Sequence, residues 1–392
     1  MTYEWNHSTI NDVCVLVTDG SHSSPKSVND GKYMVSVKDF TDYGFDFASC
    51  RMISNDDYET LKRNGCVPQI DDILIGKDGA RFFEDIIIYR QREKPALLSS
   101  IAILRCDKSK ILPDFLYYVL RTPSFRQDVK DNYGSGSAIP RIILKDFKRM
   151  MVSYPSLEKQ QAIISVLTAI DSKIQANTEI NDNLQQQAAA LFSSLYDRSN
   201  TEVRFTDLIQ ILGGGTPKTG ENTYWNGNIA FFTPKDVGTP YTLITEKTIS
   251  KEGLSHCNSR LYPVNTVFVT ARGTVGKVGM SGVPMAMNQS CYALVGKETH
   301  QLLVYFYTLK AVDRLKHKAS GAVFDAITTR DFESEQIMKL SDDDATAFLR
   351  VAEPMFQEVL NNNIENLRLS TLRDSLLPKL MSGEIDVSAV QL

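Results

Sequence analysis

The sequence lacks the features that mark membrane, secreted and metal-binding proteins. No run in its 392 residues approaches the ~18 consecutive apolar residues of a membrane-spanning helix. Residues 1–5 do not begin the basic and then apolar pattern of a signal peptide. The six cysteines are scattered without paired spacing, which favours free thiols over disulfides or a zinc site. We therefore expect a cytoplasmic protein without a bound metal.

Sequence signatures of catalysis are also missing. The five histidines form no HExxH pair, no Gly-x-Ser-x-Gly string occurs, and the cofactor and catalytic strings of a DNA methyltransferase are absent. The strings GGGTPK (213–218) and RGTVGK (272–277) resemble phosphate loops but do not have the Walker spacing. The pair Asp71-Asp72 is interpreted as a surface or turn feature. We expect no catalytic residue and no cofactor on this chain.

The net charge of −4 is distributed unevenly. Residues 1–155 are neutral, residues 156–200 carry −2, residues 201–340 carry +3 and residues 341–392 carry −5. The globular parts are therefore neutral to mildly basic, and any DNA contact must come from local patches rather than a global positive field. This modest charge favours weak binding alone and partners that contribute the rest.

A helical stripe of mostly apolar residues in 4-3 spacing occurs twice, 185 positions apart. The first copy runs from Ile163 to Leu195 and the second from Phe348 to Leu380. Such a stripe is the seam along which one helix packs lengthwise against another. Two positions in each copy are asparagine, namely Asn177, Asn181, Asn362 and Asn366. A polar residue in a seam costs stability and commonly sets the register, so these four residues are candidates for that role.

The two long helices are expected to pair antiparallel. With their midpoints aligned, Asn177 meets Asn366 and Asn181 meets Asn362 in a central polar layer, whereas parallel pairing would stack like on like. Pro354 should kink or restart the second helix near Glu353, because proline removes one helical hydrogen bond.

The repeat extends upstream of the helices. With small slips, VPQIDDILIGKDG (67–79) resembles YPVNTVFVTARG (262–273), and ALLSSIAIL (96–104) resembles AMNQSCYAL (286–294). Slips of this kind are typical of loop insertions. We therefore expect an α+β fold with two similar mixed α/β modules, each followed by a long helix.

Shorter patterns predict the elements inside each module. β-Branched and aromatic runs predict strands at 86–89, 101–104, 266–270 and 292–295. Helices are predicted at 113–120 and 301–309, each followed by a second, basic helical stretch. Ser156 is the predicted N-cap of the first long helix, and the second should end at Leu377-Pro378 or shortly past it, before Ser382-Gly383.

Several local strings resemble one protein family when they are taken together. They are PSLEKQQ (155–161), GGGTPK (213–218), YWNG (224–227), TPKDV (233–237), ARGTVGK (271–277) and LLPKLMSGE (376–384). As a set they resemble the DNA-specificity (S) subunit of type I restriction-modification systems, and the resemblance covers essentially the whole chain. TDGSHSSP (18–25) looks like another variety of recognition domain, so the two halves should read different sequences.

The resemblance implies a domain order and a set of partners. It implies target-recognition domains at residues 1–155 and 198–340, each followed by a conserved helical region, at 156–197 and 341–392. The helices would form a pseudo-twofold, duplicated coiled coil. The implied partners are double-stranded DNA, two adenine-N6 methyltransferase (M) subunits and restriction/translocase (R) subunits. S-adenosylmethionine, ATP and Mg are expected on those partners only. The acidic helix faces, including residues 342–344 and Glu353, are candidate docking surfaces.

DNA contacts are expected from polar and glycine-rich loops, whose backbone N–H groups and nearby side chains can reach phosphates and base edges. The candidates are Lys26, Lys77, Arg81, Ser135 and Arg141 in the first half, and Gly214, Thr216, Lys218, Lys235, Arg272, Thr274 and Lys277 in the second. For the glycine strings and for residues 135–137 with Arg141, a purely structural turn remains the alternative.

The expected target is two short half-sites that flank unread bases. The stripe from Ile163 to Leu195 would span roughly 48 Å at ~1.5 Å per residue, more than one DNA turn of about 34 Å. A stand-alone bipartite DNA-binding regulator is the alternative, and co-purification with a methyltransferase would separate the two hypotheses.

Overall fold

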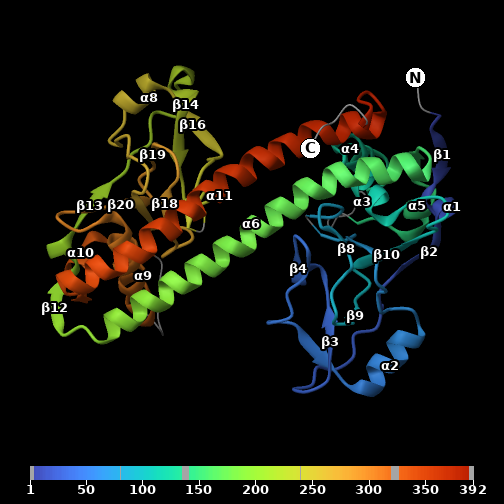
Figure 1. The fold of residues 1–392 in the computed structure, drawn as a ribbon, viewed down its shortest axis with the longest axis horizontal. Coiled ribbons are helices and arrows are strands. Elements are labelled where there is room, and N and C mark those ends of the chain that lie inside the picture. The colour runs from blue at the N-terminus through green and yellow to red at the C-terminus, as the bar shows by residue number, and fades with distance from the viewer. Residues whose placement is uncertain (1–3, 80, 135–140, 239, 319–325, 388–392) are drawn as a thin grey trace. The chain divides into compact units, whose positions relative to one another are not determined.

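The chain forms two compact units (Figure 1). The computed structural model describes residues 4–79, 81–134, 141–238, 240–318 and 326–387. Unit 1 comprises Met1–Ser172 and Leu369–Leu392, and unit 2 comprises Lys173–Arg368. The two long helices, α6 (Leu157–Asp197) and α11 (Asp342–Ser382), each contribute residues to both units.

Unit 1 is built on a four-stranded and a three-stranded sheet. Its strands are β1 (Asn6–Thr9), β2 (Cys14–Asp19), β3 (Lys32–Val35), β4 (Phe40–Thr41), β5 (Gly44–Phe45), β6 (Arg51–Ile53), β7 (Ile73–Gly76), β8 (Ile86–Ile88), β9 (Ala96–Leu97), β10 (Ile101–Cys106) and β11 (Met151–Tyr154). The larger sheet is antiparallel with the order β2-β10-β7-β8, and the smaller has the order β6-β3-β9. β1 pairs with β11 and β4 with β5.

Helices cover one face of the larger sheet of unit 1. Besides part of α6 and of α11 they are α1 (Ile10–Val13), α3 (Pro113–Arg121), α4 (Pro123–Asn132) and α5 (Leu144–Arg149). Helix α2 (Asn55–Arg63) packs instead on the smaller sheet, and the 3-10 turn η1 (Val37–Asp39) precedes β4. Successive residues of a strand face opposite sides of its sheet. Ile73 and Ile75 of β7 accordingly join the core under α3 and α6, whereas Leu74 joins a second cluster with Tyr89. Both faces of this strand are buried, which explains its unbroken apolar run.

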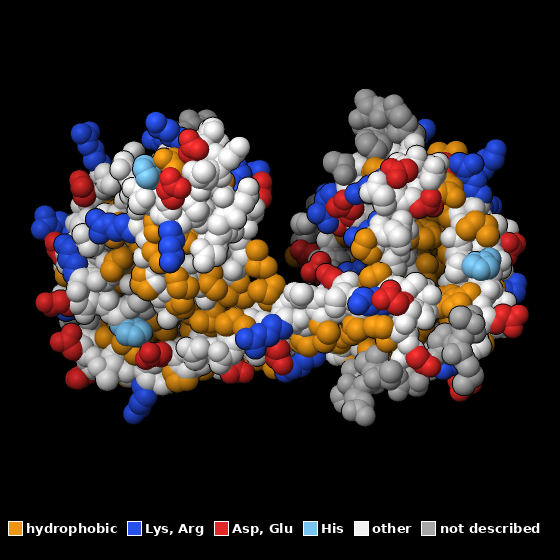
Figure 2. Space-filling model, turned by 90° about the horizontal axis from the view of Figure 1, so that it is seen from above, with side chains coloured by type: hydrophobic (Ala, Val, Ile, Leu, Met, Phe, Trp, Pro, Cys, Tyr) orange, Lys and Arg blue, Asp and Glu red, His pale blue; other side chains and the backbone are white. Residues whose placement is uncertain are grey.

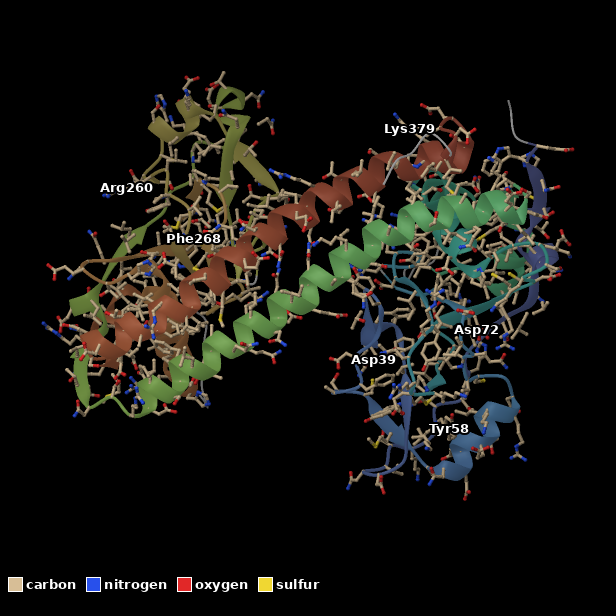
Figure 3. The ribbon with its side chains drawn as sticks, viewed as in Figure 1. Asp39, Tyr58, Asp72, Arg260, Phe268 and Lys379 are labelled. Atoms are coloured by element: carbon tan, nitrogen blue, oxygen red, sulfur yellow. The ribbon has the colours of Figure 1, made fainter. Side chains whose placement is uncertain are left out.

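Asp72 is buried inside unit 1, so of the two roles expected for it, surface or turn, it has the turn role (Figure 3). Its carboxylate accepts hydrogen bonds of 2.8 Å from both Nε and Nη2 of Arg105. The Asp72 carboxylate also accepts a hydrogen bond from the backbone N–H of Gln69 at 2.7 Å. The neighbouring residue Asp71 adopts φ +71°. The pair closes the turn that leads into β7. Because this carboxylate is fully satisfied by Arg105 and the backbone, it has a structural role.

Unit 2 repeats this plan. Its strands are β12 (Thr201–Arg204), β13 (Ile209–Gly213), β14 (Trp225–Phe232), β15 (Tyr241–Thr242), β16 (Lys247–Ile249), β17 (Val267–Thr270), β18 (Val278–Ser281), β19 (Met285–Met287), β20 (Cys291–Gly296) and β21 (Gln336–Lys339). The order β13-β20-β17-β18-β15 corresponds to β2-β10-β7-β8 with one added edge strand. The order β16-β14-β19 corresponds to β6-β3-β9, and β12-β21 to β1-β11. The equal topology confirms the internal duplication predicted from the sequence.

The core of unit 2 is rich in aromatic rings. Its helices, besides parts of α6 and α11, are α7 (Phe205–Leu208), α8 (Lys251–Ser255), α9 (Gln301–Lys318) and α10 (Thr329–Ser334), with the 3-10 turn η2 (Asn222–Tyr224). Phe192 of α6 stacks on Phe306 of α9 at 4.9 Å between ring centroids. On the other face of the sheet, Phe268 of β17 packs on Phe232 at 4.6 Å (Figure 3).

The predicted strands are confirmed, and one helix prediction needs correction. Residues 86–89, 101–104, 266–270 and 292–295 fall within or next to β8, β10, β17 and β20. In unit 1 the second helical stretch is separate, because Pro123 starts α4 after Thr122 leaves the helical conformation at ψ 140°. In unit 2 the two predicted stretches form the single helix α9, which has no proline.

The long helices begin and end close to their predicted limits. α6 begins directly after Ser156 as predicted. α11 ends at Ser382, slightly later than predicted, just before Gly383 in the left-handed region at φ +74°. α11 is assigned as one helix through Pro354, so the predicted restart near Glu353 was wrong. Ala352 and Phe356, which flank this proline, are buried in the core of unit 2. Their packing stabilises the helix across the missing hydrogen bond.

The part of the helix pair within unit 1 is joined by a polar network. Arg373 of α11 donates to Asp171 of α6 at 2.8 Å, and Tyr118 of α3 donates to the same carboxylate at 2.6 Å. Burial alone would lower the pKa of Arg373, but hydrogen bonds to Asp171 and Asp374 raise it above its ordinary value. Because Asp171 bonds both Arg373 and Tyr118, this network ties the C-terminal end of α11 to the fold of unit 1.

Candidate nucleic-acid interface

The loops that follow four strands of unit 2 meet at one edge of its two sheets. We call residues 213–218, 233–236, 271–277 and 288–290 the unit 2 loop cluster. Backbone hydrogen bonds join them: Gly215 N–H donates to Met287 O at 3.1 Å, Asn288 N–H to Phe232 O at 3.0 Å, and Ala271 N–H to Ser290 O at 2.8 Å. The strands therefore hold these loops in a common frame.

All seven candidates predicted in the second half lie in this cluster. The Thr216 hydroxyl donates to the Gln289 side chain, and the Thr274 hydroxyl donates to Pro234 O at 3.2 Å. Thr274 thus places its loop beside Lys235, whose side chain is 80% exposed. Arg272 is exposed and forms a backbone bridge with Ala326. Hydroxyl, amide and cationic side chains from separate segments thus share one exposed edge.

Lys218 and Lys277 lie at the margins of the unit 2 loop cluster. Both side chains are exposed. Trp225 Nε1 donates to the Lys218 carbonyl at 3.1 Å, and the Lys277 amide donates to Thr270 Oγ1 at 2.9 Å. These bonds hold the two backbones in place while leaving the ammonium groups to solvent. Flexible exposed ammonium groups at the edge of a rigid frame are suited to phosphate contact.

The glycines of this cluster have packing reasons of their own. A Cβ on Gly214 would lie 2.1 Å from Asn288 O, so only glycine permits this approach of the two backbones. Gly273 and Gly276 have φ of +83° and +74°, in the region that favours glycine. These glycines therefore have the structural turn role that was named as the alternative. That role does not conflict with a DNA contact by the same backbone.

An equivalent cluster is present in unit 1. We call residues 20–26, 77–79, 98–100 and 141–142 the unit 1 loop cluster. Ser21 N–H donates to Leu97 O at 2.7 Å, and Lys77 N–H donates to Ser100 O at 2.9 Å. A Cβ on Gly20 would lie 2.3 Å from Leu97 O, at the end of β9. Gly214 of unit 2 packs in the same way against the backbone at the end of β19. The two units therefore use the same backbone frame.

The structure changes the interpretation of Lys77. Its side chain is only 9% exposed, and its ammonium lies 3.3 Å from Asp19 Oδ2 and 3.8 Å from Asp78 Oδ1. The prediction that Lys77 contacts DNA therefore conflicts with its burial. Reaching a phosphate would require breaking a buried ion pair, which is strongly unfavourable. Lys77 instead neutralises acidic side chains beneath the loops.

The other unit 1 candidates differ in exposure and in partners. Lys26 and Arg141 are exposed, and Arg141 forms a backbone bridge with Asp78. Arg81 is 71% exposed, but its guanidinium is 2.6 Å from Asp85. Ser135 lies outside the described residues. Lys26 and Arg141 are the cations of the described part of this cluster with the most open access to a ligand.

Two polar residues of the loop clusters were missed in the sequence. They are Gln289, whose exposed side chain accepts from Thr216, and Asp78, whose place in the frame corresponds to that of Arg272. The signal was available, because the repeat alignment of 67–79 with 262–273 already faces Asp78 with Arg272. An acidic side chain does not attract phosphates, so charge alone did not single out Asp78 among the loop residues.

The surface charge agrees with local rather than global attraction. On the face of unit 2 drawn in Figure 2, Lys and Arg side chains stand among Asp, Glu and neutral side chains. Exposed Lys235, for example, has Glu246 Oε2 at 3.6 Å. Any nucleic acid would therefore be held by specific loops more than by a broad field.

The polar layer of the long helices is present within unit 2. Asn177 Nδ2 donates to Asn366 Oδ1 and Asn362 Nδ2 donates to Asn181 Oδ1, both at 2.9 Å, which is the expected antiparallel pairing. Asn181 Nδ2 donates to Asn363 Oδ1 at 2.9 Å, a partner not expected from the seam. Three of the four predicted layer residues are buried: Asn177, Asn181 and Asn362.

Three of the acidic side chains proposed as docking surfaces have close partners within unit 2. Asp344 lies 2.6 Å from Arg198, and Asp342 lies 3.6 Å from Lys339. Glu353 lies 3.6 Å from His300. These ion pairs are consistent with an acidic face of α11 that stabilises unit 2. They do not by themselves indicate a docking surface.

Within the described residues, nothing resembles a metal or nucleophilic centre. No group of three His, Cys, Asp or Glu residues there could hold a metal ion. Burial raises the pKa of Cys291 to about 12, so this thiol stays protonated and unreactive at neutral pH. None of the helices in the described ranges is long and apolar enough to cross a membrane.

Comparisons with known proteins agree with this geometry. The family model for the type I restriction modification DNA specificity domain matches residues 3–186 and 198–339. The HindI specificity subunit of Haemophilus influenzae is 24% identical over 369 residues, with 72% of this chain and 80% of that protein covered. The MjaIX specificity subunit of Methanocaldococcus jannaschii is 22% identical over 307 residues, with 71% of each chain covered.

The fold is also similar to a solved structure. It resembles the crystal structure of the S subunit of a type I restriction-modification system from M. genitalium, with a TM-score of 0.58. The two share 15% identity, and 96% of each chain is covered. At this identity the likeness concerns the fold.

Proposed function

The chain belongs to the family of type I restriction-modification DNA specificity subunits, and on that premise we propose that each unit reads one half of a bipartite DNA site with its loop cluster. It is a sequence-specific DNA-recognition subunit and not itself an enzyme. The observation that carries the proposal is one backbone frame built twice with different exposed side chains, such as Thr216 and Arg272 in unit 2. The shared backbone arrangement positions the two loop clusters in the same way, and their different side chains allow them to recognise different bases.

We assign the domains by the bounds expected from the sequence. Residues 1–155 and 198–340 are the two target-recognition domains, and residues 156–197 and 341–392 are the conserved helical regions. The starts of α6 at Leu157 and of α11 at Asp342 support the first boundary of each helical region.

We divide the DNA contacts by chemistry. The exposed ammonium groups of Lys26, Lys218, Lys235 and Lys277 are assigned to phosphates. The guanidinium groups of Arg81, Arg141 and Arg272 are assigned to base edges or phosphates, and Thr216 and Thr274 orient neighbouring groups of the cluster. Gly214 keeps the backbone of its loop close to β19.

The subunit assembles with the other parts of a restriction-modification complex. We propose two methyltransferase subunits and restriction subunits as its protein partners, in the cytoplasm where the DNA lies. S-adenosylmethionine, ATP and Mg would then be bound by those partners. The modest charge of the globular parts supports the proposed partners, since partners that enclose the DNA would increase the affinity of the complex for it.

Pull-down and methylation mapping test the proposal together. A tagged full-length chain, expressed in its own host, should co-purify with a methyltransferase, and adenine methylation should map to two short blocks separated by unread bases. Deletion of the gene should remove that methylation, and a Lys339→Ala variant, changed outside the loop clusters, should restore it. Recovery of DNA without a methyltransferase would favour the stand-alone regulator, and a single contiguous motif would contradict two readers.

A further inference from the structure

Asp78 and Arg272 occupy the same place in the two backbone frames. Each stands two residues after the end of an inner strand, β7 or β17. Each is followed by a glycine with positive φ, Gly79 at +96° and Gly273 at +83°. The loop therefore turns in the same way directly after both side chains.

The hydrogen bonds around the two positions are also equivalent. The preceding residue donates its amide to Ser100 O at 2.9 Å in unit 1 and to Ser290 O at 2.8 Å in unit 2. Its carbonyl accepts from Ile142 at 3.0 Å and from Ile327 at 2.9 Å. Asp78 bridges to Arg141 and Arg272 bridges to Ala326. These three matched contacts fix the direction in which each side chain leaves the frame.

The side chains at this shared position have opposite chemistry. Among the described residues, the Arg272 guanidinium has no hydrogen bond or ion pair, and the residue is exposed. The Asp78 side chain is 32% exposed. Its Oδ1 is buried and has no hydrogen-bond donor among the described residues, so the acceptor that this carboxylate can offer to a ligand is Oδ2. Lys77 is the main ion-pair partner of Asp19 and not of Asp78, because its ammonium lies 3.3 Å from Asp19 Oδ2 and 3.8 Å from Asp78 Oδ1. One position thus offers donors in unit 2 and acceptors in unit 1.

We infer that Asp78 and Arg272 are equivalent specificity-determining residues, one for each half-site. Arginine pairs with O6 and N7 of guanine, and aspartate accepts from the N4 amino group of cytosine. Arg272 accordingly selects guanine in its half-site, and Asp78 selects cytosine in the other. Lys77, whose ammonium lies 3.8 Å from Asp78 Oδ1, offsets part of the negative charge of Asp78 near phosphates. The inference rests on the proposed function, because it assumes that the loop clusters face DNA.

Selection from a randomised duplex library by the full-length chain tests this inference. Arg272→Ala should reduce the preference for guanine at one position about 5- to 150-fold, with the other half-site unchanged. Asp78→Ala should reduce the preference for cytosine at one position of that other half-site by a similar factor. Lys235→Ala is the matched control in the same cluster, and should weaken all duplexes alike. Arg272→Lys and Asp78→Asn, which keep the size of the side chains, guard against loss of folding and should also relax one position each.

The outcomes separate this inference from the function on which it rests. A wild-type chain that binds all duplexes equally would overturn both. A wild-type chain with a clear motif, together with variants that keep every base preference, would overturn the inference alone. Arg272→Ala that weakens all sequences alike would also reject it, since that result is the signature of a phosphate contact.

Discussion

Burial divides the cations of the loop clusters into two classes with different energetics. Lys77 is 9% exposed and paired with Asp19, so its charge is already committed within the protein. Lys218 and Lys277 have exposed side chains and backbones that the frame holds in place. A solvated ammonium loses little by moving from water to a phosphate, and it releases a counterion from the DNA. The exposed class therefore supplies the affinity that does not depend on sequence.

At Lys218 this distinction leads to a quantitative expectation. Lys218→Ala should weaken binding of all duplexes alike and lower the slope of log affinity against log salt by ~1. Titration of a labelled duplex at several salt concentrations would measure both effects. Lys339→Ala is the control, because Lys339 lies in β21 outside the loop cluster and pairs with Asp342 at 3.6 Å. An unchanged salt slope for Lys218→Ala would remove this residue from the interface.

At the level of elements, the two long helices are joined by different chemistry in the two units. In unit 1 the charged pair Arg373 and Asp171 lies between them. In unit 2 the repeat positions of these residues hold Ala188 and Phe356, which are buried in an apolar core. The duplicated helix pair is therefore symmetric in backbone plan but not in its contacts.

The asparagine layer of unit 2 makes a testable contribution to helix register. Asn181→Leu or Asn362→Leu alone would leave a buried amide without its partner, at a cost of about 1–3 kcal/mol. The double variant removes both amides, so its loss should be smaller than the sum by about 0.5–3 kcal/mol. Urea unfolding of the four proteins would give this coupling. Asn183→Leu, on an exposed site of the same helix, should change stability by less than about 0.5 kcal/mol. Strict additivity would show that the layer does not couple the helices.

Glu365 gives the same helix pair a dependence on pH. Hydrogen bonds from Asn177 at 2.7 Å and from Lys173 at 3.2 Å lower the pKa of its carboxyl below the ordinary 4.5. A lowered folded-state pKa means that the stabilisation is present above pH 4.5 and is lost as the pH falls through the folded pKa. Wild-type protein should therefore be more stable than Glu365→Gln at pH 7, and this difference should shrink below pH 4.5. Denaturation midpoints over this pH range would show it, and parallel curves for the two proteins would contradict it.

For the molecule as a whole, the important property is that each unit has its own core. The cluster around Phe268 contains only residues of unit 2, as does the larger cluster around Phe192. The main cluster of unit 1 likewise draws only on residues of unit 1, including the end of α11. A substitution in the core of one unit should therefore lower the stability of that unit first.

Phe268→Ala tests this independence. Removal of the fully buried ring should destabilise unit 2 by about 3–5 kcal/mol. Hydrogen exchange should accelerate in peptides of unit 2 while peptides of unit 1 keep their protection. Leu261→Ala in the same unit is the control, because Leu261 is 50% exposed and should have little effect. Equal acceleration in both units would show that they unfold together.

The sequence by itself determined the duplication, the long helices and the pairing of their asparagines. These features depend on periodicity and on repeated spacing, which are local properties that the chain carries in its order of residues. The register followed because an antiparallel seam allows Asn177 to meet Asn366 only when the midpoints align. The shared place of Asp78 and Arg272 is also contained in the repeat.

Tertiary structure alone decided which polar residues can be reached. Lys77 and Lys235 are both lysines in polar loops, yet one is buried against Asp19 and the other is 80% exposed. Tertiary packing also allowed α11 to continue through Pro354 between buried Ala352 and Phe356. Exposure and helix continuity at these sites depend on contacts between segments that are distant in the chain, and no local pattern encodes them.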